Sequence, residues 1–169
     1  HANHPYPSAA HCEAATAALA SLHGPTSAPS GDGACGGPTN VLDSLVRTIL
    51  SQNTTDVTSL RAFEQLTAAF PTWRAVLDAP EGAAEDAVRC GGLAEIKMGR
   101  VRAILSALLA EGRHAPGSGG CEPSLEHLRE LDTASAKREL ARFKGVGPKT
   151  ASCVLVFALG RPEFPVDTH

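Results

Sequence analysis

The sequence predicts an all-α fold, and three of its features support that prediction. Apolar residues recur at spacings of three and four through most of the chain after residue 40, as on the buried face of an amphipathic helix. Glycine and proline fall between these segments, where helices usually end. No segment shows the alternation of apolar and polar residues that is typical of a half-buried strand.

Residues 1–38 are predicted to be a disordered tail, and residues 39–169 a single helical domain. The tail is rich in Ala, Gly, Pro, Ser and His, and its apolar content is too low to offset the entropy lost on ordering. Four of the seven histidines lie in it, and we interpret them as solvated residues without a metal-binding role: His1, His4, His11 and His23.

Four helices are predicted before residue 92. The first has its apolar face at Val41, Leu42, Leu45, Val46, Ile49 and Leu50, and it breaks at 51–55. The second, with Val57, Leu60, Phe63 and Leu66, must end before Pro71, because proline disfavours helical geometry in the residue before it. Thr72 is the predicted N-cap of a short third helix. The fourth extends from about Glu81 to Arg89 and ends at Gly91-Gly92.

Four more helices are predicted after this glycine pair. The fifth carries Ile96, Val101, Ile104, Leu105, Leu108 and Leu109, and a flexible loop over 112–122 follows it. A sixth is predicted from Leu125, Leu128 and Leu131. A seventh, capped by Asp132 or Thr133, is predicted from Ala136, Leu140 and Phe143. The last covers Pro148 to Leu159, since proline suits the first turn of a helix and Gly160 suits its end.

Charge is distributed unevenly along the chain. The net charge of -3 argues against a protein that binds nucleic acid by bulk electrostatics. Between residues 137 and 149, however, a single Glu139 stands against five basic residues: Lys137, Arg138, Arg142, Lys144 and Lys149. A smaller basic run, Lys97, Arg100 and Arg102, lies beside Glu95. Any nucleic-acid site is therefore predicted to be local.

The segment most informative about function is Phe143-Lys144-Gly145-Val146-Gly147-Pro148-Lys149-Thr150-Ala151, between two predicted helices. Two glycines one residue apart allow a sharp turn and the close approach of another molecule, because neither has a Cβ atom. The N–H groups and the positive dipole end of the next helix face this turn. The pattern favours a phosphate-binding turn, although a plain tight turn between helices has the same glycine spacing.

This hairpin, followed one helix later by Val166-Asp167-Thr168-His169, resembles the helix-hairpin-helix and Gly-Pro-Asp (HhH-GPD) signature of DNA glycosylases, and within them endonuclease III. The resemblance covers Val41 to His169. It implies a helical bundle or barrel of the DNA glycosylase type. It also implies that the hairpin residues Lys144, Gly145, Val146, Gly147 and Thr150 bind DNA.

Two other segments resemble endonuclease III. Gln52, in the stretch Leu50 to Asp56, matches a glutamine that fills the gap left by an extruded nucleotide, and Leu93, after Gly91-Gly92, matches a leucine that wedges into the duplex. Each also has a purely structural interpretation. Gln52 could satisfy backbone groups at a helix end, and Leu93 could be the apolar contact that accompanies a glycine helix terminus.

The resemblance implies that Lys149 is a nucleophile and Asp167 its acidic partner. An amine can displace a base from C1′ and leave a Schiff base, from which β-elimination cuts the strand. The helix terminus and Lys144 are expected to lower the pKa of Lys149, and Asp167 to balance the developing sugar cation. Asp167 also fits a helix N-cap. Family members with lysine at this position are typically both glycosylase and AP (abasic-site) lyase, so both activities are expected.

The substrate is left open between several interpretations. Oxidised pyrimidines in base-excision repair are what the overall resemblance implies. Phe164-Pro165-Val166-Asp167-Thr168 also resembles plant 5-methylcytosine glycosylases of the DEMETER type. A non-catalytic helix-hairpin-helix DNA-binding module would account for Gly145 and Gly147 but not for Lys149 with Asp167. A helical protein-interaction domain would show no salt-dependent DNA binding.

Endonuclease III carries a four-cysteine iron–sulfur site after the aspartate, where this chain ends. The chain is therefore expected to lack C-terminal helices that form one wall of the active-site cleft, which puts its activity in doubt. Its five cysteines, Cys12, Cys35, Cys90, Cys121 and Cys153, have no metal-ligand spacing. We expect no metal or cofactor in this chain, and a [4Fe–4S] cluster only in a longer protein.

The expected partner is double-stranded DNA that contains a damaged or modified base, bound by a monomer. No apolar run approaches the roughly 20 residues of a membrane span. Scattered cysteines suit a reducing compartment. We expect an intracellular protein, located in the nucleus, with a DNA-containing organelle as the alternative.

Overall fold

The computed structural model describes residues 7–24 and 40–166, and over these ranges it consists of helices, turns and loops without a strand. The closest approach to sheet pairing is an isolated antiparallel bridge between His114 and Pro123, at the two ends of the predicted glycine-rich loop. The predicted all-α class is confirmed. The chain divides into two compact units, residues 1–30 and 31–169, which are described separately.

The first unit contains helix α1 (Ala9–His23), in a segment for which the sequence analysis predicted no ordered element. Ser8 caps it by accepting a hydrogen bond from the backbone N–H of His11. Alanine, which has the highest helix propensity, dominates its sequence and accounts for the helix. None of its residues is buried, so α1 adds nothing to a core. The predicted boundary of the tail at residue 38 lies outside the described residues and stays a prediction.

The second unit contains seven α-helices and two 3₁₀ turns among its described residues. The helices are α2 (Val41–Leu50), α3 (Asp56–Ala69), α4 (Trp73–Asp78), α5 (Ala83–Ala87), α6 (Ala94–Ala110), α7 (Thr133–Ala141) and α8 (Pro148–Phe157). The 3₁₀ turns are η1 (Arg89–Gly91) and η2 (Glu126–Glu130). The predicted N-caps are confirmed for α4, where Thr72 accepts from the N–H of Ala75, and for α7, where Asp132 accepts from the N–H of Ser135.

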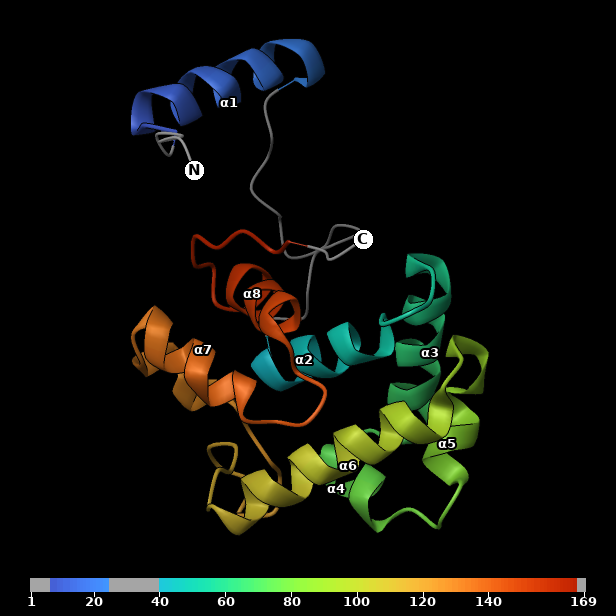
Figure 1. Ribbon diagram of the computed structural model, residues 1–169. Coiled ribbons are helices and arrows are strands. Elements are labelled where there is room, and N and C mark those ends of the chain that lie inside the picture. Colours follow the sequence, from blue (N-terminus) through green and yellow to red (C-terminus); the bar gives the residue numbers. More distant parts are fainter. Residues whose placement is uncertain (1–6, 25–39, 167–169) are drawn as a thin grey trace, which may run out of the picture. The chain divides into compact units, whose positions relative to one another are not determined.

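Helix α2 lies at the centre of this unit. It contacts α8, α3, α6 and η2, so that α7 and α8 lie on one side of it and α3 to α6 on the other (Figure 1). Its side chains Leu42, Leu45 and Ile49 are fully buried. Burying a side chain of this size stabilises a fold by about 1.5–3 kcal/mol. The apolar face predicted for this helix therefore forms the junction between the two groups of helices.

Two predicted helices differ from the structure. The sixth is not an α-helix but the 3₁₀ turn η2, which contains Leu128 and is flanked by Leu125 and Leu131. The prediction failed because a spacing of three residues fits the 3₁₀ period as well as an α-helix. The fourth is shorter than predicted, since Gly82 has a left-handed φ of 85° and α5 begins only after it. Helix α5 ends at Ala87, and the turn η1 begins at Arg89, the last residue of that predicted helix.

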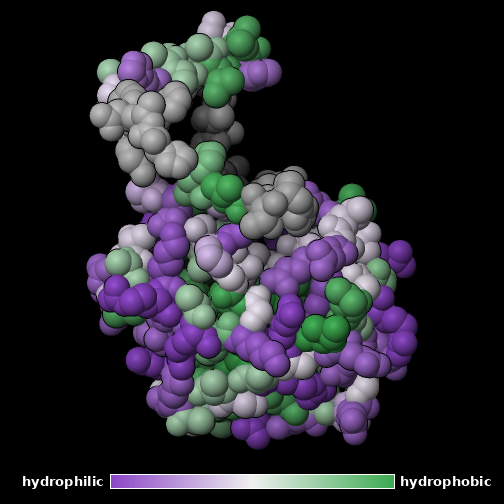
Figure 2. Space-filling view, viewed as in Figure 1, coloured by the Kyte–Doolittle hydropathy of each residue, from purple (hydrophilic) through white to green (hydrophobic). Residues whose placement is uncertain are grey.

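Apolar side chains are sparser on the surface of the helical unit than in its core (Figure 2). Figure 2 shows one face of the helical unit, on which hydrophilic side chains surround small apolar patches. Among the described residues, no helix is long and apolar enough to cross a membrane.

Candidate DNA-binding and catalytic site

The hairpin lies between the end of α7 and the start of α8. Gly145 has a left-handed φ of 90°, and a Cβ atom there would lie 2.5 Å from Cδ of Arg100. This position therefore requires glycine. Gly147 is extended, with a φ of -87°, and precedes Pro148 in the first turn of α8. Val146 is buried and holds the turn to the core, while Lys144, Gly147 and Lys149 are exposed.

Gln52 connects this hairpin to the loop after α2. Its amide nitrogen donates hydrogen bonds to the carbonyl of Gly145 (3.1 Å) and to Oγ1 of the buried Thr150 (3.3 Å). Its amide oxygen accepts a hydrogen bond from Nη1 of Arg100 (2.9 Å). The structure thus brings together three predicted DNA-binding positions, Gln52, Gly145 and Thr150. Of these partners, the carbonyl of Gly145 is a backbone group in the turn before α8, which also agrees with the purely structural interpretation of Gln52.

Lys149 lines a pocket of about 460 Å³ between the α2–α3 loop and α8. The other residues around this pocket are Thr48, Ser51, Gln52, Asn53, Thr54, Asp56, Thr150 and Cys153. Asn53 has a left-handed φ of 53°, a conformation that asparagine tolerates better than most residues. Of these residues, Gln52, Lys149 and Thr150 were predicted from the sequence as site residues. Cys153 could have been added, since a residue four positions after Lys149 shares its helix face.

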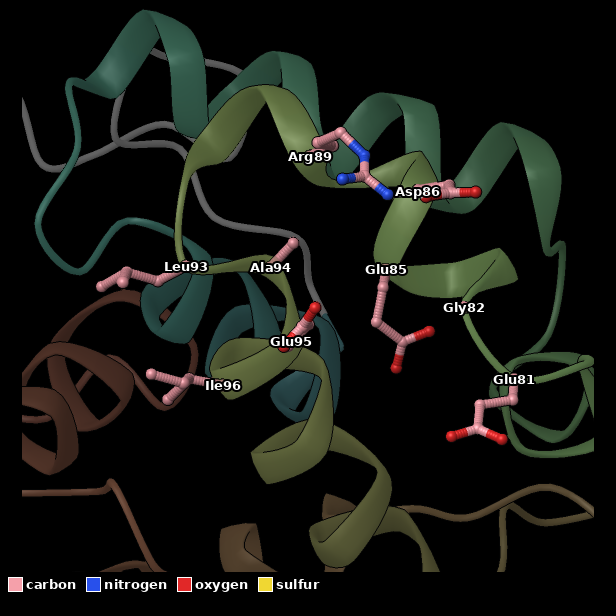
Figure 3. A pocket seen from close by; sticks show the side chains of 9 residues that line it. All are labelled: Glu81, Gly82, Glu85, Asp86, Arg89, Leu93, Ala94, Glu95 and Ile96. Carbon is pink, nitrogen blue, oxygen red and sulfur yellow. Dashed lines mark hydrogen bonds and ion pairs between the residues drawn. The ribbon is translucent and has the colours of Figure 1, made fainter.

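Leu93 lies in a second region, at the start of α6. It is 51% exposed and left-handed, with a φ of 52°, although it carries a branched side chain. Such a backbone costs of order 1–3 kcal/mol and is found mostly at functional sites. In Figure 3, Leu93 and the 53% exposed Ile96 point to the same side, away from Glu81 and Glu85. All four residues border a hollow of about 660 Å³, separate from the Lys149 pocket.

The segment that leads to Asp167 is attached to the helical unit by two charged side chains. Nη2 of Arg161 donates to the carbonyl of Leu128 (3.0 Å). The carboxylate of Glu163 accepts from Nζ of Lys137 (2.8 Å) and from Oγ of Ser152 in α8 (3.0 Å). These two hydrogen bonds lower the pKa of Glu163. Asp167 itself lies outside the described residues, so its predicted role stays a prediction.

The described residues offer no place for an iron–sulfur cluster. Cys12, Cys90 and Cys121 are exposed, and Cys153 is half-buried in α8. In the same ranges, no group of three or more His, Cys, Asp or Glu side chains is placed to hold a metal ion. A cluster in a longer protein therefore stays a prediction from the resemblance.

Comparison with known sequences gives one family. The family described as HhH-GPD superfamily base excision DNA repair protein matches residues 46–169. A protein of Arabidopsis thaliana named as a DNA glycosylase is 50% identical over 131 residues, which cover 77% of this chain and 42% of the relative. Endonuclease III of Sulfolobus acidocaldarius is 31% identical over 137 residues, 80% of this chain and 55% of the relative. The chain thus spans about half the length of these curated relatives.

Solved structures share the fold. A non-covalent endonuclease III–DNA complex matches with a TM-score of 0.66 and 22% identity over 95% of this chain and 64% of that one. A trapped covalent endonuclease III–DNA intermediate gives a TM-score of 0.65 at 22% identity, with the same coverage. The 3-methyladenine DNA glycosylase of H. pylori, bound to 1,N6-ethenoadenine, gives 0.67 at 20% identity, over 91% of this chain and 67% of that one. By its family match and its fold, this chain belongs to the HhH-GPD superfamily of base excision DNA repair proteins.

Proposed function

We propose that this chain carries the catalytic residues of a DNA N-glycosylase with associated AP lyase activity, and that Lys149 is its nucleophile. The observation that carries the proposal is the placement of Lys149. It is exposed in the first turn of α8, directly after the hairpin, and it lines the same pocket as Gln52 and Thr150. The names of the curated relatives, and the covalent DNA intermediate described for endonuclease III, support the same chemistry.

The proposed reaction begins with attack by the lone pair of Nζ of Lys149 on C1′ of the target nucleotide. The bond between C1′ and the base breaks, and the base takes up a proton as it leaves. Opening of the sugar ring gives a Schiff base with Lys149, and loss of a C2′ proton then breaks the C3′–O bond of the strand. In this scheme Asp167 balances the developing sugar cation and accepts the proton released by Lys149.

DNA binding is proposed to divide between two regions. The Gly145 turn, the exposed Lys144 and the N-terminal end of α8 form a phosphate site, as helix N-termini commonly do. Leu93 is the apolar wedge between base steps. Gln52 can fill the gap left by the extruded nucleotide only after its hydrogen bonds to Gly145 and Thr150 break. We propose that this rearrangement of Gln52 accompanies DNA binding.

Oxidised pyrimidines are the proposed substrates. The second candidate is 5-methylcytosine, which is favoured by the resemblance of Phe164-Pro165-Val166 and the following residues to DEMETER-type glycosylases. The test uses labelled duplexes that differ in one base, thymine glycol, 5-methylcytosine or cytosine, with Lys149→Ala as the inactive control. Cleavage at thymine glycol alone supports the first substrate, and cleavage at 5-methylcytosine supports the second. Binding without cleavage of either duplex indicates either a non-catalytic DNA-binding module or an enzyme that needs residues of a longer protein, and the same assay on the longer protein distinguishes the two.

A monomeric state and a nuclear location remain part of the proposal. Size-exclusion chromatography with light scattering tests the first, and localisation of the tagged longer protein tests the second.

A further inference from the structure

Lys97 is a buried cation for which the proposed chemistry has no use. Its side chain is 2% exposed, and Nζ donates hydrogen bonds to the carbonyls of Leu50 (2.8 Å) and Gly91 (2.9 Å). Burial lowers the pKa of Lys97. Both acceptors are neutral backbone groups, and such groups offset the cost of removing an ammonium from water less well than a carboxylate does.

The two acceptors have a specific place in the chain. Leu50 is the last residue of α2, and Gly91 is the last residue of η1. Gln52 follows Leu50 by two residues, and Leu93 follows Gly91 by two residues. One ammonium group thus joins the backbone just before each of the two side chains proposed to enter the duplex.

The two segments that Lys97 joins are residues 50–53 and 91–93. They contain both non-glycine residues that have a positive φ in the described part of the chain, Asn53 and Leu93. Strained backbone of this kind persists only where surrounding contacts hold it. On the Leu93 side, Gly91 is also packed closely, since a Cβ atom there would lie 3.3 Å from Cβ of Ala62. Lys97 donates a hydrogen bond to each of these two segments.

We propose that Lys97 is a positioning residue that couples the loop carrying Gln52 (residues 51–55) to the turn carrying Leu93 (residues 89–94). The two side chains then enter the duplex together at an extruded nucleotide. Lys97 is buried and acts through these two backbone segments without touching DNA. A methionine would fill similar volume without the cost of a buried charge. The proposed gain from lysine is therefore the relative placement of the two segments. This inference rests on the proposed function.

The first part of the test uses the whole chain without DNA. Amide hydrogen exchange is compared between the wild type, Lys97→Met and Lys97→Gln, which keeps an N–H donor. Arg102→Met is the matched control, because Arg102 is another cation of α6 that donates to a backbone carbonyl, that of Leu77. Both lysine variants are expected to speed exchange in residues 51–55 and 89–94 together, by about tenfold for Lys97→Met. Faster exchange in one segment only, or equal effects of Arg102→Met, would overturn the coupling.

The second part measures affinity for a duplex with a tetrahydrofuran abasic analogue and for the same duplex without it. Lys97→Met is expected to weaken binding of the analogue about tenfold and binding of the plain duplex less than twofold, since only the analogue site accepts both segments. A uniform loss, or no loss, would contradict the proposal. A wild type that shows no preference for the analogue would count against the proposed function instead, and the exchange experiment would still decide the coupling.

Discussion

The side-chain amide of Gln52 donates a hydrogen bond of 3.1 Å to the backbone carbonyl of Gly145, 93 residues further along the chain. The loop after α2 and the turn before α8 are therefore joined directly. Arg100 completes the network, because its guanidinium donates to the amide oxygen of Gln52 and packs where a Cβ atom of residue 145 would lie. The residue assigned to the nucleotide gap and the residue assigned to the phosphate turn belong to one hydrogen-bonded unit.

Gln52→Leu is expected to destabilise the protein by about 1–3 kcal/mol, because it leaves the carbonyl of Gly145 and a half-buried Arg100 without this partner. Urea unfolding measures the loss. Gln65→Leu, at an exposed position of α3, should change the free energy of unfolding by no more than about 0.5 kcal/mol. Equal effects of the two substitutions would show that the Gln52 network does not stabilise the fold.

Gly145→Ala is expected to reduce DNA affinity at least about fivefold. An alanine would have to adopt a left-handed φ, at a cost of roughly 1–2 kcal/mol, and would displace Arg100. Gly99→Ala is the control: this exposed position of α6 has open space for a Cβ atom, and alanine there should raise stability by up to about 1 kcal/mol. Fluorescence anisotropy on a labelled duplex checks the affinity, and an unchanged value for Gly145→Ala would exclude the turn as a phosphate site.

Lys144→Ala is expected to weaken binding of all duplexes equally and to reduce the slope of log affinity against log salt by about 1, because one phosphate contact is lost. Titrations at several salt concentrations give the slope. Arg74→Ala removes an exposed cation of α4 that is paired with Asp78, and it should leave the slope unchanged. The interpretation of Lys144 fails if the two variants have the same slope.

Glu163→Gln is expected to destabilise the protein at pH 7 but not at strongly acid pH. The pKa of Glu163 in the folded state is lowered from 4.5 by Lys137 and Ser152. The folded state therefore favours the carboxylate, and this contribution is present above pH 4.5 and disappears as the pH falls through the lowered pKa. Unfolding midpoints measured at intervals from pH 7 downward test this. The exposed Glu64→Gln serves as control, and a difference for Glu163→Gln that does not shrink as the pH falls below 4.5 would contradict the assignment.

Much of the fold could be predicted from the sequence, because apolar spacing and end signals agree in most helices. Helices α2, α4 and α8 follow the predicted apolar spacing, and Thr72 caps α4 and Pro148 begins α8 as predicted, whereas α8 ends at Phe157, two residues before the predicted Leu159. Where a signal fits two structures, the prediction failed: the leucines around η2 have a spacing that also suits a 3₁₀ turn. Helix α1 was missed because its alanines form a helix without an apolar face to bury.

The candidate site could be predicted only where local motifs reveal it. The hairpin glycines, Lys149 and Leu93 stand out in short segments. Arg100 and Lys97 do not, since their roles depend on contacts with residues about 50 positions away in the chain. The sequence shows them only as members of a basic run, whereas Lys97 is buried and adds nothing to a charged surface.

The measurement that tests the central claim most directly is borohydride trapping on a duplex with an abasic site. The wild-type chain, Lys149→Ala and Lys149→Arg are compared with Asp167→Asn under the same conditions. We expect a covalent adduct with the wild type, a weaker one with Asp167→Asn, and none with either Lys149 variant, because borohydride reduces a Schiff base to a stable amine and Lys149 is the proposed source of that Schiff base. An adduct of undiminished yield with Lys149→Ala would contradict the assignment of Lys149 as the nucleophile.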